Sequence, residues 1–177
     1  AGHLPGTEAY IRELAAGTQN PDTTDISTVP PKTIGGKIAG WTFPAILLLL
    51  FAAGFFTGGA VTSIDMLIRW LLWNGTLSAI GTAVALGHPL AIVTAFVGAP
   101  IATINPFIGV GLFSGLVQAL LRKPQVRDME HLAQDVTTIR GFYRNRISHV
   151  LLVFFLSSLG GAIGNFIAVP ALIGSLL

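Results

Sequence analysis

Two long runs without a charged residue constrain the fold of this chain more than any other feature. No Asp, Glu, Lys or Arg occurs in residues 38–64, and none occurs between Arg69 and Arg122. A helix needs about 20 apolar residues to cross roughly 30 Å of hydrocarbon, so the second run has room for more than one crossing. Only 10% of the residues are charged, against roughly a quarter in soluble domains. The pattern predicts an all-α, polytopic integral membrane helix bundle.

Three full crossings are expected from the lengths of the apolar segments. The first covers residues 41–63. The second covers residues 66–87, and residues 66–69 supply the interfacial turn at its start. The third covers residues 148–169, and Pro170 is expected to end or kink it because proline removes a helical hydrogen bond.

The basic residues predict the topology and, with it, a broken helical hairpin at residues 89–121. Lys32 and Lys37 precede the first crossing, and residues 122–146 are the most basic segment, so the positive-inside rule makes both flanks cytoplasmic. The first two crossings already return the chain to that side. Residues 89–121 are therefore expected to re-enter as two half-helices, 89–98 and 107–121, with a turn around residues 99–105 that contains the helix breakers. Two short full crossings by residues 89–121 are the alternative, because they would also keep the number of crossings between the two basic flanks even.

Composition along the chain predicts three regions. Residues 1–14 are expected to form a short helix at the tail of a longer protein, and residues 15–38 are a linker rich in Gly, Pro, Thr and Asp. Residues 39–177 are the transmembrane domain. Within it, apolar residues recur at three- and four-residue steps over residues 124–144, which predicts an amphipathic helix at the membrane interface. A solvated helix that covers the crossings is the alternative.

Small and polar residues in the apolar runs are the candidates for helix contacts and for a site. Three G-x-x-x-G spacings let helices approach closely, within one chain or between copies in a homo-oligomer: Gly54 with Gly58, Gly111 with Gly115, and Gly160 with Gly164. Asn74, His88 and Asn105 are polar groups that need partners in hydrocarbon. They either line a pocket or path beside the broken hairpin, or they serve structure, Asn74 by joining helices and the other two by capping half-helices.

Five short segments resemble one family in the family's own order. They are WNGTLSAIG at 73–81, GHPLAIVTAF at 87–96, APIATINP at 99–106, RKPQVRD at 122–128 and YRNR at 143–146. Together they are similar to the C-terminal membrane region of the TraB/PrgY pheromone-shutdown family, which is related to the Tiki and GumN proteins. The resemblance implies a membrane domain that anchors an upstream metal-dependent hydrolase domain and presents a peptide substrate to it.

The same resemblance gives His3 a role. Ala1-Gly2-His3 is similar to the end of the family's second Gly-x-x-His motif, which implies a catalytic or metal-binding histidine whose remaining partners and divalent metal belong to the parent protein. An exposed residue at a frayed terminus is the structural alternative. The isolated chain is expected to be inert. A transport or channel module and a structural oligomerisation unit are the other functions considered, and the net charge of +2 gives no support for nucleic-acid binding.

Overall fold

The computed structural model describes residues 4–17, 33–104 and 109–176, and every regular element within them is a helix, which confirms the all-α prediction. The chain divides into two compact units, Ala1–Gly36 and Lys37–Leu177. In the first unit, α1 (Leu4–Ala15) is a short exposed helix in which Arg12 pairs with Glu8 at 2.6 Å. The second unit holds the greater part of the helix Ile34–Val84, all later helices and both core clusters of the described residues.

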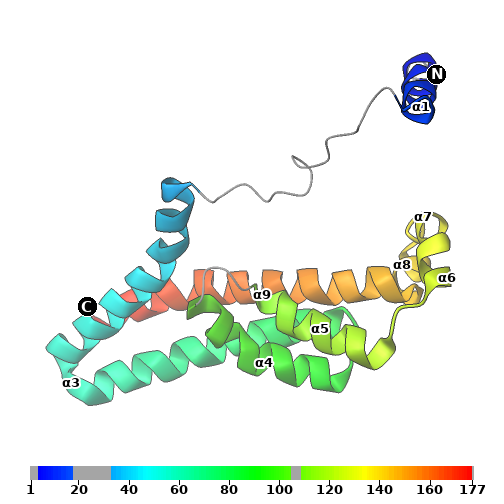
Figure 1. Cartoon of the computed structure of the whole chain (residues 1–177). Coiled ribbons are helices and arrows are strands. Elements are labelled where there is room, and N and C mark those ends of the chain that lie inside the picture. The colour runs from blue at the N-terminus through cyan, green and yellow to red at the C-terminus, as the bar shows by residue number, and fades with distance from the viewer. Residues whose placement is uncertain (1–3, 18–32, 105–108, 177) are drawn as a thin grey trace. The chain divides into compact units, whose positions relative to one another are not determined.

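Helix α3 (Ile34–Val84) is bent into two limbs at Gly59, as Figure 1 shows. Gly59 has φ 76° and ψ −173°, a conformation that glycine adopts without the strain a side chain would add. The turn predicted at residues 66–69 is therefore wrong. Asp65 and Arg69 lie within the second limb, residues 60–84, and their side chains pair at 2.6 Å one helical turn apart, so the two charges do not interrupt the helix.

The two limbs pack against each other and against α9 (Arg146–Gly174) close to the bend. The hydroxyl of Ser63 donates to the carbonyl of Phe51 across the bend at 3.0 Å. Beyond it, the core cluster consists of Leu47, Met66, Trp70, Ala168 and Leu172. Pro170 lies inside α9, which continues to Gly174, so of the two effects expected of Pro170, an end or a kink, the end is wrong.

Helices α4 (Pro89–Ile104) and α5 (Val110–Arg122) form an antiparallel hairpin, as the broken-element prediction requires. Near the break, Ala99 and Ala102 pack with Val110. At the open end, the backbone N–H of His88 donates to the side-chain oxygen of Gln118 at 2.8 Å. Asn105 and Pro106, in the expected turn, lie outside the described residues.

The expected end of the first half-helix at residue 98 is wrong, because α4 continues through Pro100 to Ile104. Proline has no N–H, so the carbonyl of Phe96 loses its helical donor. Gly75 of α3 lies directly against that carbonyl, and a Cβ at Gly75 would be 2.7 Å from the oxygen. The neighbouring glycine backbone covers the carbonyl that Pro100 leaves free, which allows the helix to pass through the proline.

Three short helices between α5 and α9 form a cap at the end of the bundle where α9 begins. They are α6 (Val126–Glu130), α7 (Leu132–Asp135) and α8 (Ile139–Arg144). The prediction of one continuous helix over residues 124–144 is therefore wrong. Thr138 adopts an extended conformation and its hydroxyl accepts the N–H of Gly141, so this side chain starts a new helix instead of continuing the previous one.

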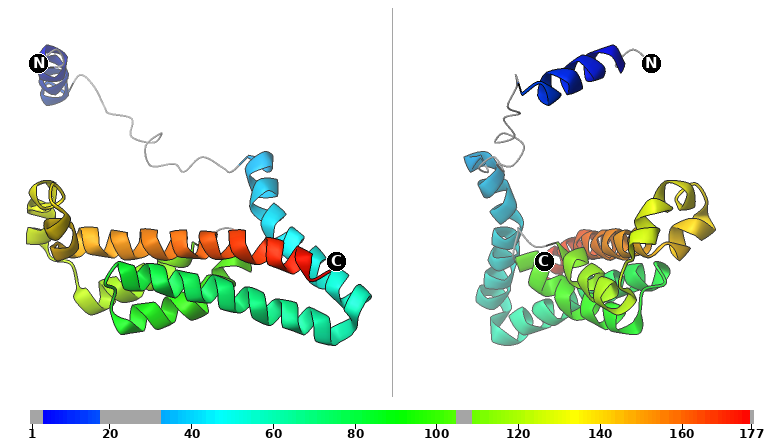
Figure 2. Two further views of the ribbon diagram at one scale, coloured as in Figure 1. Left: turned by 180° about the vertical axis from the view of Figure 1, so that it is seen from behind. Right: turned by 45° about the vertical axis from the view of Figure 1, so that its right-hand side comes forward.

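Helix α9 runs along the second limb of α3 and the α4–α5 hairpin, and both views in Figure 2 agree on this arrangement. The three glycine spacings make contacts within the chain. Gly160 and Gly164 lie against the α3 backbone at Leu77 and Asn74, and Gly111 and Gly115 lie against Phe154 of α9. Gly54 and Gly58 face Met66 and Thr62 across the bend.

Replacing Gly59 with alanine should lower the free energy of unfolding by about 1–3 kcal/mol, because φ 76° with ψ −173° is a backbone conformation essentially restricted to glycine. A Cβ at Gly59 would meet no atom within 4 Å, so the loss reports the backbone conformation alone. Gly174→Ala is the matched control, since it is equally open and lies in ordinary helix. Thermal unfolding in detergent, followed by circular dichroism, measures both variants. Equal stability of the two would contradict the assigned bend.

Candidate functional site

Buried polar side chains line the inner faces of the second unit's helices. We call this set the polar seam: Asn74, Ser78 and Thr82 of α3, Thr103 of α4, Ser114 and Gln118 of α5, and His149, Ser157 and Asn165 of α9. Asn74, Ser78 and Thr82 follow one another at four-residue steps, which places them on one face of the second limb. Most members of the set are fully buried, so their polar atoms depend on one another for hydrogen bonds.

One end of the polar seam is a cluster of amides near the break in the hairpin. The amide nitrogen of Asn74 donates to Thr103 Oγ1 at 3.1 Å and to Asn165 Oδ1 at 2.6 Å. The indole N–H of Trp70 donates to the same Asn165 oxygen at 3.0 Å. Asn74 Oδ1 is buried and has no hydrogen-bond partner among the described residues. The cluster joins α3, α4 and α9 through side chains that carry no charge.

The middle of the polar seam consists of serines. Ser78 donates to the carbonyl of Ser157 at 3.0 Å, and the hydroxyls of Ser114 and Ser157 share a hydrogen bond of 2.7 Å. The helices approach closely enough for these short side chains to meet because glycines lie beside them. A Cβ at Gly81 would collide with the carbonyl of Leu156 on α9.

The other end of the polar seam is built around His149. Its Nε2 lies 2.8 Å from the carbonyl of Ala85, and its Nδ1 lies 3.4 Å from both Gln118 Nε2 and Arg122 Nη1. A carbonyl needs a donor and the two nitrogen groups need an acceptor, so these contacts favour the tautomer with its hydrogen on Nε2. Gln118 also accepts the His88 N–H, and the network therefore ties the turn before α4 to α5 and α9.

The structure separates the residues that the sequence singled out. Asn74 joins three helices at one end of the seam. His88 lies at the other end, where its Nδ1 accepts the N–H of Leu90 at 3.2 Å and caps the start of α4. Both therefore have the structural contacts that were considered as the alternative to a pocket. Asn105 and His3 lie outside the described residues.

Sequence reasoning missed three of the polar groups on which the network depends, namely Gln118, His149 and Asn165. Each is fully or partly buried and hydrogen-bonded to another helix. The signal that selected Asn74, an amide inside an apolar run, is equally present at Gln118 and Asn165. A uniform search for amides and imidazoles in the apolar runs would have found all three.

The polar seam offers mainly neutral hydrogen-bonding groups, and His149 is its titratable member. The described residues contain no group of three or more His, Cys, Asp or Glu side chains that could hold a metal ion. Ser114 and Ser157 bond each other and the carbonyls of Gly111 and Phe154, and no base contacts either hydroxyl. The arrangement is suited to holding helices together. A metal-dependent step would need ligands beyond these residues.

These features define an all-helical domain in which two helices, α3 and α9, are long and apolar enough to cross a membrane. The family model described as TraB family protein, C-terminal domain, matches residues 35–177. The chain therefore belongs to the TraB family, which confirms the resemblance noted from its motifs. It is also 29% identical over 181 residues to an uncharacterized protein of Methanocaldococcus jannaschii, covering 99% of this chain and 45% of that relative. No solved structure matches.

Thr103→Val should destabilise the fold by roughly 1 kcal/mol more than Thr94→Val, because only Thr103 accepts a hydrogen bond from Asn74. The two threonines are closely matched. Both are half-buried on α4, and each donates to the carbonyl four residues before it, at 2.8 Å for Thr103 and 2.7 Å for Thr94. Unfolding of the two variants in detergent gives the difference directly. Equal losses would mean that the Asn74 bond contributes nothing to stability.

Proposed function

We propose that residues 39–177 are a multi-pass membrane domain that anchors an upstream hydrolase-like domain of a TraB-family protein and presents substrate to it. The observation that carries this proposal is the polar seam, which contains no carboxylate and joins the helices by direct hydrogen bonds. An interior of this kind is suited to a rigid helix assembly. Family membership supplies the context, since this chain spans less than half the length of the curated relative it matches.

The lengths of the helices support crossings by both limbs of α3 and by α9. Each limb has about 25 residues and α9 has 29, which correspond to roughly 37 and 43 Å at 1.5 Å per residue. Hydrocarbon is about 30 Å thick. Helices α4 and α5 have 16 and 13 residues, or roughly 24 and 20 Å, and fall short of that thickness. A re-entrant hairpin therefore fits them better than two full crossings.

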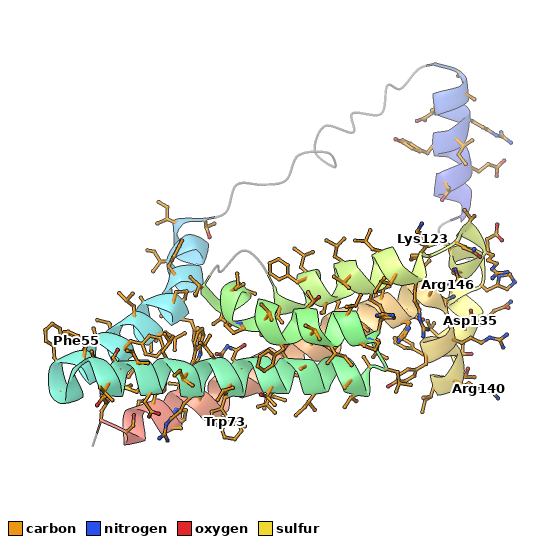
Figure 3. All side chains as sticks on the ribbon, turned by 90° about the horizontal axis from the view of Figure 1, so that it is seen from below. Phe55, Trp73, Lys123, Asp135, Arg140 and Arg146 are labelled. Atoms are coloured by element: carbon orange, nitrogen blue, oxygen red, sulfur yellow. The ribbon has the colours of Figure 1, made fainter. Side chains whose placement is uncertain are left out.

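Charge supports a cytoplasmic position for the cap. Six basic side chains lie in or beside it: Arg122, Lys123, Arg127, Arg140, Arg144 and Arg146. Figure 3 shows three of them, Lys123, Arg140 and Arg146, at one end of the second unit and Phe55 at the other. The positive-inside rule then orients the domain with the cap, Lys32 and Lys37 on the cytoplasmic side.

A transport or channel module is the second candidate, and one observation favours it. Asn74 Oδ1 is a buried acceptor without a partner among the described residues, and it lies next to the break in the hairpin. Broken helices and unpaired polar groups mark substrate paths in transporters. The middle of the polar seam argues against a substrate path, because Ser78 and Ser114 each form a direct hydrogen bond with Ser157.

Labelling of single cysteines tests the topology, and the native chain contains no cysteine to interfere. Cysteines at Thr33 and Gln134 should react from the cytoplasmic side. Cysteines at Thr57, next to the bend, and at Ser175, after α9, should react from the opposite side. All four native residues are exposed. Labelling of Thr33 and Gln134 from opposite sides would reject the even number of crossings and the re-entrant hairpin with it.

Activity is expected from the full-length parent and not from this chain alone. We propose that residues 1–14 end the hydrolase-like domain and that His3 acts there with a divalent metal. The purified parent should hydrolyse peptides when divalent metal is added, and His3→Ala should remove that turnover. Gln134→Ala, an exposed residue of the cap that does not line the pocket described below, is the control and should retain activity. Metal-dependent turnover by the 177-residue chain would overturn the assignment.

A further inference from the structure

A cavity of about 410 Å³ lies in the cap, beside the first residues of α9. We call it the cap pocket. Its lining includes three arginines together with two aspartates and a histidine: Arg127, Arg144, Arg146, Asp128, Asp135 and His131. Figure 3 shows Asp135 and Arg146 at this end of the second unit. None of these residues takes part in the polar seam, so the cap pocket is a separate feature of the fold.

Asn145 gives the cap pocket a rigid base. Its side chain is buried, and its amide nitrogen donates to the carbonyl of Asp128 at 2.6 Å and to Asp135 Oδ2 at 2.9 Å. Its oxygen accepts the N–H groups of Ile147 and Ser148 at the start of α9. One side chain thus fastens α6 and α7 to the first turn of α9 and holds the pocket in shape without a ligand.

The carboxylates of the cap pocket have donors within the protein, whereas its arginines have no acid partner. Asp128 Oδ2 accepts the N–H of Gln125 at 2.8 Å, and Asp135 is bonded to Asn145. Among the described residues, no carboxylate oxygen lies within 4.0 Å of a guanidinium nitrogen of Arg127, Arg144 or Arg146. Arg146 donates one hydrogen bond, from Nη1 to the carbonyl of Lys123 at 3.1 Å. The pocket therefore presents guanidinium groups without a carboxylate partner, which are suited to an anion with several oxygens.

Apolar side chains exposed on the cap indicate where that anion comes from. Val126, Met129 and Ile139 are 78%, 65% and 82% exposed, and they lie on the helices α6 and α8 that form the pocket. A surface that combines exposed apolar side chains with arginines is typical of segments at the level of lipid headgroups. Free phosphate would need only the arginines.

We infer that the cap pocket binds the phosphate group of a phospholipid headgroup. The inference rests on the proposed membrane placement of this domain. The guanidinium groups of Arg127 and Arg144 donate to the phosphate oxygens from α6 and α8, and Arg146 donates from the start of α9. Because Asn145 already holds these elements together, the headgroup enters a formed site.

Binding of dioctanoyl phosphatidylglycerol to the whole chain in a neutral detergent, counted by native mass spectrometry, tests the inference. Arg127→Gln combined with Arg144→Gln should weaken binding about tenfold or more, the loss expected for charged hydrogen bonds. Arg127→Lys should give a smaller loss, since it keeps the charge. Arg140→Gln on α8, which does not line the pocket, is the matched control and should change binding less than twofold. Circular dichroism verifies that each variant is folded.

Three results would overturn the inference. The first is an equal loss of binding in the double variant and in Arg140→Gln. The second is equally tight binding of dioctanoylglycerol, which lacks phosphate. The third is displacement of the lipid by inorganic phosphate at equal concentration, which would assign the pocket to a soluble anion. The assay uses micelles and does not depend on the number of crossings, so failure of the topology prediction and failure of lipid binding are separate results.

Discussion

The rest of the second unit depends on the close contact between α9 and the second limb of α3. Gly81, Gly160 and Gly164 have no side chain at this contact, so the two backbones meet almost directly. The hydroxyl of Ser78 can then reach the carbonyl of Ser157, and the amide of Asn74 can reach Asn165. In an apolar surrounding, where water offers no alternative partner, such short-range hydrogen bonds and dense packing hold helices together.

The need of buried polar groups for a partner also explains how the domain accommodates the irregular points in its helices. Each irregular point leaves backbone groups without a helical partner, and a buried backbone group without a partner costs free energy. Gly75 lies against the carbonyl that Pro100 leaves free, and near the bend at Gly59 the hydroxyl of Ser63 adds a hydrogen bond between the two limbs, to the carbonyl of Phe51. At the entry to α4, Gln118 accepts the N–H of His88. At Pro100 and at the entry to α4, a neighbouring helix supplies the missing contact, so these two irregular points are part of the packing.

The polar seam and the cap pocket differ in charge and in how far their polar groups are already hydrogen-bonded within the protein. The polar seam is neutral, internally bonded and closed, which suits a rigid assembly. The cap pocket is charged and presents arginines without acid partners at the end of the bundle, where a polar headgroup can meet them. The charged side chains of the cap pocket thus lie apart from the polar seam, whose amides and hydroxyls need hydrogen-bond partners but no counter-ion.

The sequence by itself determined the helical class, the apolar segments, the broken hairpin and the family, because these follow from composition, charge-free length and local motifs. It misplaced the first bend at residues 66–69, because the charges of Asp65 and Arg69 resemble an interruption; in the structure the two side chains pair within a continuous helix and the bend lies at Gly59. It selected Asn74 and missed Asn165, its partner 91 residues away. Only the tertiary structure decided which polar groups meet and which carbonyls are covered, because hydrogen bonds between helices depend on distances of a few ångströms that no local pattern encodes.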